Sequence, residues 1–262
     1  MLGAGRRRLY LMRHGHVDYF APGLDDPRSV PLTDQGCEQA AAAADALADI
    51  HFDIAVHSGL PRTKQTLEIL LKDREEHPPT RQLDGLEELK SGWLKAESRE
   101  ALAAILAFSF DKADQKGARF LPDGELFADA ENRIIQALEG LIKSDDVLSQ
   151  NWRTGLVVAH EGVNRIILGW LSGGGLKSVA AFEQDLCCVN VIDIDVTPNE
   201  AGNGLQIERA VLKAVNVTPY DYIKQGLPRT SLEHLFGVDF GHTRPQEGFG
   251  EKTASLAGTT TE

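Results

Sequence analysis

A histidine and an arginine stand together where the first apolar run of the chain ends. Residues 9–12 have the composition of a strand, and Arg13, His14 and Gly15 follow them directly. Open α/β sheets place their chemistry at the carboxyl ends of strands. A guanidinium beside an imidazole suits an anion, and a glycine lets backbone approach a ligand closely. The tripeptide therefore indicates an anion site, and its partners elsewhere in the chain must define the chemistry.

A second histidine follows another apolar run. Residues 155–159 are continuously apolar, which is typical of a strand buried on both faces, and His160 comes immediately after them. A helix is expected to begin just beyond this histidine. The free backbone N–H groups and the dipole at a helix N-terminus favour an anion there. We therefore expect His160 and His14 to face the same ligand.

A second arginine extends this anion-binding set. Residues 58–66 follow the strand expected over residues 53–57, and they place Arg62 in the first turn of a helix at the same sheet edge. Two histidines and two arginines thus come from three strand ends, and a tetrahedral dianion can accept hydrogen bonds from all of them. Charge-assisted bonds of this kind contribute roughly 1.5–3 kcal/mol each. The set predicts a site that holds a phosphoryl group.

Transfer of a phosphoryl group also needs an acid. Attack by an imidazole on phosphorus expels an alkoxide, which leaves poorly unless it is protonated. The loop 86–93 carries Glu87 and Glu88 and is expected at the same edge of the sheet. Either carboxyl group can supply the proton, so the residue types alone leave the choice open.

The elements that must position these residues alternate between strands and helices. The patterns predict strands over residues 8–12, 53–57, 155–159, 189–196 and 207–215, and helices over residues 33–48, 62–72, 126–143 and 163–171. The last two strands form a hairpin in this scheme. The expected fold class is α/β, a doubly wound and mostly parallel sheet with helices on both faces and a helical insertion over the active site. We expect one domain over residues 1–236, the insertion over residues 94–121 and a mobile tail over residues 237–262.

The composition and net charge of the chain limit the kinds of partner that it can bind. The 262 residues carry 27 Lys and Arg against 39 Asp and Glu, a formal net charge of −12. An acidic protein is a poor binder of nucleic acid or of an anionic membrane surface. The three cysteines have no metal or redox spacing, and no segment approaches a membrane span, so the cytoplasm is expected. The expected partner is a small phosphorylated substrate, without nucleic acid or membrane, and the apolar hairpin edge could pair with another subunit in a homo-oligomer.

Taken together, these segments resemble the histidine phosphatase superfamily, which includes the phosphoglycerate mutases. Six segments are similar to those of the family and occur in its order: residues 13–15 (the signature), 31–40, 58–66 (the second arginine), 86–88 (the acid), 122–128 and 157–160 (the second histidine). Within the acid segment, the spacing favours Glu88 over Glu87. The resemblance covers most of the chain, residues 9–173.

The resemblance implies a role for each site residue. His14 is the catalytic nucleophile, which attacks phosphorus in line and forms a phosphohistidine. Arg13 and Arg62 bind the substrate and, together with the catalytic His160, hold the equatorial oxygens and their growing charge. Glu88 protonates the leaving oxygen and then helps a water molecule to attack the phosphohistidine. The implied mechanism uses no metal and no organic cofactor.

The chain departs from the family around these motifs. Asp18 and Tyr19 stand in a turn that lacks the asparagine of many members, and Glu161 stands where many members have glycine. A carboxylate at that position would repel an extra anionic group on the substrate or accept a bond from a hydroxyl. The basic run that binds the second phosphate in the mutases is missing after the acid segment. A phosphatase is therefore favoured over a phosphoglycerate mutase-type phosphotransferase.

Two other functions stay open. His14, His16 and Asp18 have the His-x-His-x-Asp spacing of metal-dependent hydrolases. That assignment lacks the histidine that would come next, puts Arg13 beside a dication and leaves Arg62 unexplained. The other function is a catalytically silent relative that binds a phosphorylated ligand. Such a relative would commonly lose a histidine or the acid, and here all of them are present.

Overall fold

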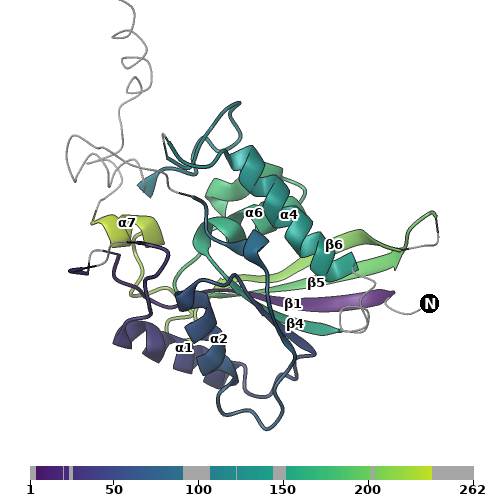
Figure 1. The fold of residues 1–262 in the computed structure, drawn as a ribbon, viewed down its shortest axis with the longest axis horizontal. Coiled ribbons are helices and arrows are strands. Elements are labelled where there is room, and N and C mark those ends of the chain that lie inside the picture. The colour runs from purple at the N-terminus through teal and green to yellow at the C-terminus, as the bar shows by residue number, and fades with distance from the viewer. Residues whose placement is uncertain are drawn as a thin grey trace, which may run out of the picture.

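A six-stranded mixed sheet forms the centre of the molecule (Figure 1). The computed structural model describes residues 4–19, 21–23, 26–90, 107–121, 123–143, 152–201 and 204–237. The strands lie in the order β3-β2-β4-β1-β5-β6, with bounds β1 (Gly5–Arg13), β2 (Ile54–His57), β3 (Thr80–Gln82), β4 (Thr154–Ala159), β5 (Val189–Pro198) and β6 (Leu205–Val217). β3, β2, β4 and β1 are parallel, while β5 is antiparallel to β1 and β6 to β5. The α/β sheet and its hairpin are confirmed.

Helices cover both faces of this sheet, as the doubly wound fold class requires (Figure 1). One face carries α1 (Asp34–Ala46) and α2 (Pro61–Leu71), and the other carries α4 (Phe127–Lys143) and α6 (Glu161–Leu171). The remaining described helices are α7 (Ser231–Phe236) and two short 3-10 helices, η1 (Asp84–Leu86) and η2 (Gly175–Ala181). None of the helices in the described part of the chain is long and apolar enough to cross a membrane.

The central strands divide their side chains between two apolar cores. In β1, Leu11 belongs to the core under α4 and α6, whereas Met12 belongs to the core under α1 and α2. In β4, Val157 and Val158 divide in the same way. Successive residues of a strand point to opposite faces, so a strand covered on both sides needs a continuous apolar run. This burial fixes the register of β1 and β4 and therefore the place where their carboxyl ends meet.

The starts of three helices follow from local chemistry. Thr33 caps α1, because its hydroxyl accepts a hydrogen bond from the backbone N–H of Gly36 at 3.2 Å. Pro61 lies in the first turn of α2, where its missing N–H leaves no bond unmade. α6 begins at Glu161 rather than at residue 163, and His160 is its N-cap. The second histidine therefore lies at the N-terminus of α6.

One strand, β3, and one α-helix, α7, were not predicted from the sequence. β3 pairs with β2 in parallel, but three residues are too few to give a periodic signal. α7 follows a capping box in which the Thr230 hydroxyl accepts from the backbone N–H of Glu233 and the Glu233 carboxylate accepts from that of Thr230. The T-x-x-E pattern of this box is visible in the sequence and was the available signal for α7.

Part of the predicted insertion packs into the main core. Phe110 and Ala113 belong to the same core as α4 and α6. The ring of Phe110 lies 5.7 Å from that of Phe127, measured between centroids. Residues 94–106 of the predicted insertion and residues 238–262 of the predicted tail lie outside the described residues. The covering of the active site and the tail therefore stay predictions.

Candidate active site

The two predicted histidines meet at the carboxyl edge of the sheet. β1 and β4 pair with Arg13 opposite Ala159, so His14 and His160 are the next residues on neighbouring strands. The backbone N–H of His14 donates to the carbonyl of Ala159 at 3.1 Å. The two imidazole rings are inclined at 66°, with centroids 5.2 Å apart. The register of two buried strands thus holds both rings together.

The hydrogen bonding of His14 leaves one ring nitrogen free to react. Nδ1 of this buried imidazole lies 2.7 Å from the backbone carbonyl of Gly15. A carbonyl can only accept, so Nδ1 carries the proton and Nε2 carries the lone pair. Burial, reinforced by the charges of Arg62 and Arg13, holds the pKa of His14 well below its usual range. The ring is therefore neutral near pH 7, which is the state that a nucleophile needs.

The His160 ring is held by a hydrogen bond with Ser58. Its Nε2 lies 2.7 Å from the Ser58 hydroxyl, which in turn contacts the hydroxyl of Thr63 at 3.0 Å. Burial and the nearby charge of Arg62 hold the pKa of His160 well below its usual range. This ring is also neutral near pH 7. It can therefore face a phosphoryl group without adding a full charge of its own.

Both predicted arginines are buried at the same edge. Arg62 donates from Nη1 to the carbonyl of Pro27 at 3.2 Å, and its guanidinium lies 5.6 Å from the centre of the Tyr19 ring. Arg13 donates from Nη1 to the carbonyl of Gln184 at 2.6 Å and pairs with Glu161 at 3.0 Å. Within the described chain, no carboxylate forms an ion pair with Arg62. Arg62 is therefore the less compensated of the two cations.

Three buried nitrogen atoms of this group have no hydrogen-bond partner among the described residues. They are Nε of Arg13, Nε of Arg62 and Nδ1 of His160. Buried polar atoms are nearly always paired in folded proteins, because leaving them unpaired costs free energy. An anion with several acceptor oxygens would satisfy such atoms together. The predicted anion-binding residues therefore retain the capacity that an anion site needs.

The structure separates the two candidate acids. Glu88 accepts from the backbone N–H of Leu89 at 2.9 Å and from that of Gly162 at 3.4 Å, in the first turn of α6. A Cβ atom at Gly162 would lie 2.8 Å from Oε1 of Glu88, so a larger residue there would push the carboxylate out of this place. Burial raises the pKa of Glu88, although the bond from Leu89 and the charge of Arg62 oppose it. Glu87 instead pairs with the exposed Arg28 at 2.8 Å.

Tyr19 joins the site, although the sequence marked it only as part of a turn that departs from the family. Its ring lies beside the Arg62 guanidinium. Burial raises the pKa of its phenol, an effect that Arg62 opposes and Glu88 reinforces. The phenol therefore stays protonated and can donate a hydrogen bond at neutral pH. No motif of the sequence separates this tyrosine from an ordinary loop residue.

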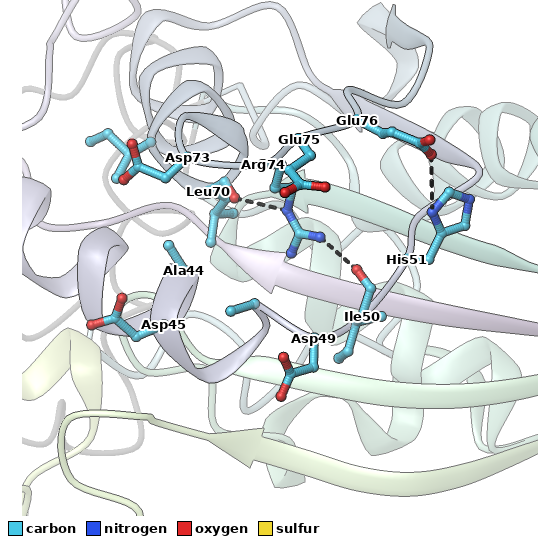
Figure 2. A pocket seen from close by; sticks show the side chains of 12 residues that line it. Ala44, Asp45, Asp49, Ile50, His51, Leu70, Asp73, Arg74, Glu75 and Glu76 are labelled. Carbon is cyan, nitrogen blue, oxygen red and sulfur yellow. Dashed lines mark hydrogen bonds and ion pairs between the residues drawn. The ribbon is translucent and has the colours of Figure 1, made fainter.

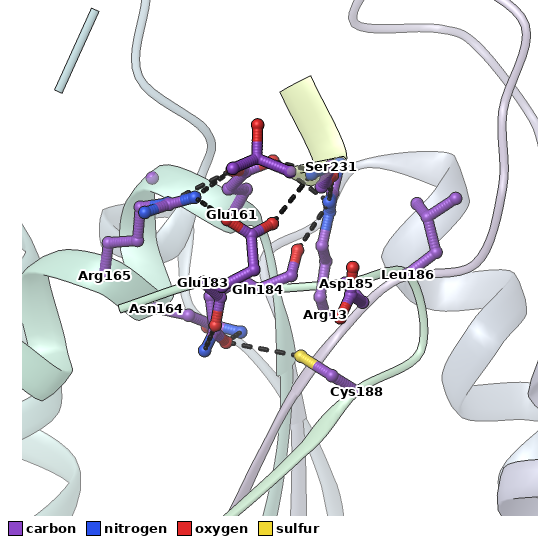
Figure 3. A network of polar contacts seen from close by, with 12 residues as sticks. Arg13, Glu161, Asn164, Arg165, Glu183, Gln184, Asp185, Leu186, Cys188 and Ser231 are labelled. Atoms are coloured by element: carbon purple, nitrogen blue, oxygen red, sulfur yellow. Dashed lines mark hydrogen bonds and ion pairs between the residues drawn. The ribbon is translucent and has the colours of Figure 1, made fainter. Parts of the chain in front are cut away.

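Glu161 lies in a buried network behind Arg13 (Figure 3). Its Oε1 accepts from Nη2 of Arg165 at 2.8 Å, and its Oε2 accepts from the Ser231 hydroxyl at 3.2 Å and pairs with Arg13. The sequence suggested that this carboxylate meets the substrate. In the structure, the groups that contact it belong to the protein itself. Arg165 lies four residues beyond Glu161 on α6, so the spacing could have identified this pair.

The residues of the His-x-His-x-Asp spacing do not form a metal site. Nδ1 of His16 lies 2.8 Å from the Thr33 hydroxyl, at the cap of α1. No group of three His, Cys, Asp or Glu residues in the described chain is placed to hold a metal ion. The glycine of the signature also has a structural reason, because a Cβ atom at Gly15 would collide with the backbone of Gly36. Gly15 therefore lets α1 approach the end of β1.

A separate hollow of about 440 Å³ lies between α1 and α2, and none of the predicted site residues lines it (Figure 2). Its charged lining is mostly acidic: Asp45, Asp49, Asp73, Glu75 and Glu76. The one arginine there, Arg74, donates to the carbonyls of Leu47, Ile50 and Leu70 at 2.7, 2.5 and 3.2 Å. Its guanidinium also lies 4.7 Å from the centre of the Phe52 ring. These contacts give Arg74 a structural role.

Residues 9–201 match the family model of the histidine phosphatase superfamily (branch 1), and the chain belongs to this superfamily. The predicted resemblance and the predicted class of enzyme, a phosphatase, are thereby confirmed at the level of the family.

The chain is similar to three proteins with related names. It is 27% identical over 190 residues to an adenosylcobalamin/alpha-ribazole phosphatase of Escherichia coli, covering 72% of this chain and 90% of that one. It is 27% identical over 170 residues to a broad-specificity phosphatase of Saccharomyces cerevisiae, covering 63% and 70%. The crystal structure of an alpha-ribazole phosphatase from Shigella flexneri superposes with a TM-score of 0.59 at 27% identity, covering 80% and 96%.

Proposed function

We propose that this protein hydrolyses small phosphomonoesters through a phosphohistidine formed on Nε2 of His14. The observation that carries the proposal is the hydrogen bond between Nδ1 of His14 and the carbonyl of Gly15. This bond fixes the tautomer in which the reactive lone pair lies on Nε2. The nearby unpartnered nitrogens of Arg13, Arg62 and His160 support the same proposal.

In the first step, Nε2 of His14 attacks phosphorus and the bond from phosphorus to the leaving oxygen breaks. Protonated Glu88 gives its proton to that oxygen, so that an alcohol leaves instead of an alkoxide. The raised pKa of Glu88 keeps more of this carboxyl protonated near neutral pH than an ordinary carboxyl group. In the second step, Glu88 takes a proton from a water molecule that attacks the phosphohistidine, and the bond from phosphorus to nitrogen breaks.

The remaining predicted site residues bind the phosphoryl group. Arg13, Arg62 and His160 donate to its equatorial oxygens, where charge grows as the leaving group departs. Because these side chains are buried before the substrate arrives, little reorganisation is needed during the reaction. The phenol of Tyr19 can donate a further hydrogen bond from the side of Arg62.

The substrate class that we propose is a small phosphorylated metabolite. The two similar proteins from Escherichia coli and Saccharomyces cerevisiae carry names with different ranges of substrate, one naming adenosylcobalamin and alpha-ribazole and one naming broad specificity. A hydrolysable phosphomonoester is what these names have in common. The residues around the phosphoryl site, such as Tyr19, are those that would distinguish one metabolite from another.

A phosphoglycerate mutase-type phosphotransferase is the second candidate, since a phosphohistidine can also return its phosphoryl group to an alcohol. Hydrolysis is favoured because the acid segment is followed by one basic residue, Lys90, rather than by a basic run in residues 89–93. Incubation with 2- and 3-phosphoglycerate separates the two activities. Hydrolysis releases phosphate from either compound, whereas a mutase interconverts them.

We also infer the setting in which this site works. The free state of Cys37, Cys187 and Cys188 agrees with the cytoplasm, and the net charge of −12 opposes binding to nucleic acid or to an anionic membrane. One domain over residues 1–236, covered by the insertion 94–121, would enclose the substrate. Pairing of the exposed β6 edge with a second copy would give a homo-oligomer.

The full chain and its His14→Ala variant test the reaction with p-nitrophenyl phosphate. We expect the variant to lose turnover and acid-labile labelling of the protein by phosphate, because the proposed acceptor of the phosphoryl group, Nε2 of His14, is gone. His51→Ala is the matched control, since its side chain is 70% exposed and lies beside the α1–α2 hollow. Near-normal hydrolysis by His14→Ala would contradict the mechanism. Binding of a phosphoester by the unmodified chain without turnover would identify a silent relative.

A further inference from the structure

A residue beyond the family match contacts the predicted substrate-binding arginine. The match ends at residue 201, whereas Ser231 opens α7. Nη1 of Arg13 donates to the Ser231 hydroxyl, and this hydroxyl donates to Oε2 of Glu161 at 3.2 Å (Figure 3). The serine oxygen therefore bridges a guanidinium and a carboxylate that also pair with each other.

Two further contacts hold α7 in this place. The backbone N–H of Ser231 donates to Oε1 of Glu183 at 2.8 Å. The next residue, Leu232, is buried in the main core together with residues of α4 and α6. The capping box of Thr230 and Glu233 fixes the start of the helix, and thereby the direction of the Ser231 side chain. The contact with Arg13 is thus part of a docked and capped element.

The charges behind Arg13 compensate one another. Glu161 lies between Arg13 and Arg165, and Glu183 lies between Arg165 and α7 (Figure 3). Arg13 and Arg165 supply two positive charges and the two glutamates two negative ones. A buried set of this kind is stable when each charge keeps its partners. A shift of α7 would therefore disturb Arg13 directly.

We propose that Ser231 is a positioning residue for Arg13, and that docking of α7 completes the phosphoryl site. This inference rests on the proposed function, in which Arg13 binds phosphoryl oxygens. Nη1 of Arg13 is held by the Gln184 carbonyl, Glu161 and Ser231, while Nε has no partner among the described residues. Holding Nη1 on the protein side fixes the plane of the guanidinium. The edge of the guanidinium that carries Nε is thereby oriented for the substrate.

The test compares Ser231→Ala with Ser231→Thr in the full chain, using p-nitrophenyl phosphate as substrate and inorganic phosphate as competitive inhibitor. Loss of the hydroxyl should lower kcat/KM and raise the inhibition constant of phosphate by roughly 10- to 100-fold, the effect of one hydrogen bond to a charged group. Threonine keeps the hydroxyl and should restore most of the activity. A role in stability alone would leave the phosphate inhibition constant unchanged.

A second variant removes the docking contact with little strain in the backbone. Proline is favoured in the first turn of a helix, and Thr230 has φ −62° and ψ 157°, which suits a residue before proline. Ser231→Pro deletes both the hydroxyl and the N–H that donates to Glu183. We expect a larger loss of phosphate binding than in Ser231→Ala. The control is Ser172→Ala, whose hydroxyl donates to the Gly169 carbonyl at 2.9 Å.

Two results would overturn the inference. In the first, Ser231→Ala and Ser231→Pro both keep the kcat/KM and the phosphate inhibition constant of the unmodified chain. In the second, Ser231→Thr loses as much as Ser231→Ala, so that the hydroxyl is irrelevant. Either result leaves the proposed function intact, because that function is tested by His14→Ala in the same assay.

Discussion

The histidine edge of the sheet and the hollow between α1 and α2 both contain arginines, but the hydrogen bonding of these arginines differs. In the hollow, Arg74 donates to the backbone carbonyls of Ile50 and Leu70 (Figure 2). It also donates to the carbonyl of Leu47 and lies over the Phe52 ring. At the histidine edge, Arg13 and Arg62 are buried with Nε atoms that lack partners among the described residues. A guanidinium whose bonds are made holds the fold together, whereas one with buried unmade bonds can hold a ligand. The difference lies in unmade bonds rather than in charge.

The acidic residues of the two regions differ in the same sense. Glu88 is placed by two backbone N–H groups, and burial raises its pKa. Glu76 of the hollow has a side chain that is 82% exposed and lies 3.9 Å from His51. Glu88 is therefore placed to act as an acid, whereas the Glu76 side chain is open to solvent.

The largest expected effect belongs to Glu88→Gln compared with Glu76→Gln. Loss of a general acid should slow hydrolysis of an alkyl phosphate by about 10²- to 10⁴-fold. An activated aryl phosphate should suffer much less, since its leaving group needs no proton. Steady-state rates on both esters measure the difference, and Glu76→Gln should match the unmodified chain. Equal losses on the two esters would move the acid to another residue, with Glu87 first.

The next effect compares Arg62→Ala with Arg74→Ala. Removing Arg62 should lower kcat/KM by roughly 10²- to 10³-fold, the usual effect of removing one donor to the transition state. Removing Arg74 should leave the rate unchanged but cost about 1–3 kcal/mol in the free energy of unfolding, because backbone carbonyls lose their donor. Steady-state kinetics and urea titration on both variants measure the change in kcat/KM and in the free energy of unfolding. A stable but inactive Arg74→Ala would break the distinction between the two regions.

The smallest expected effect concerns pH and the buried histidines. Folding lowers the pKa of His14 and of His160, so the unfolded chain binds protons that the folded chain does not. Stability should therefore fall as the pH drops below about 6.5, by up to about 1.4 kcal/mol per pH unit for each histidine. Urea titrations between pH 7 and pH 5 measure this slope.

The matched variants for this pH effect are His160→Asn and His51→Asn. His160→Asn should flatten the slope, because one buried titrating group is gone. His51→Asn should not, since the His51 side chain is 70% exposed. An unchanged slope in His160→Asn would mean that this imidazole does not carry the effect.

The parts of the site that follow strand ends could be predicted from the sequence. His14 and His160 lie at the ends of apolar runs, and parallel pairing must bring such ends together. The helix starts near Thr33 and Arg62 also carry local signals, a capping hydroxyl and a proline in the first turn. Local patterns were sufficient wherever one element fixed the position of a residue.

The remaining parts depend on contacts between distant segments. Ser231 lies 218 residues from Arg13 in sequence, so the capping box before α7 reveals the helix but not its docking place. The partners of Glu161 show the same limit, since Arg165 follows from helical spacing but Arg13 does not. The resemblance already favoured Glu88 over Glu87, but the contact of Glu88 with Gly162 on another element could not be predicted.

The ion pair of Arg13 with Glu161 also affects how a substrate arrives. One of the two site guanidiniums is already compensated, and the whole chain carries a net charge of −12. A phosphate ester diffusing toward the protein therefore meets repulsion until it comes near Arg62. At physiological salt the screening length is about 8 Å, which confines the attraction of Arg62 to its immediate surroundings. Added salt should then speed the encounter of enzyme and substrate, the reverse of what long-range electrostatic steering produces.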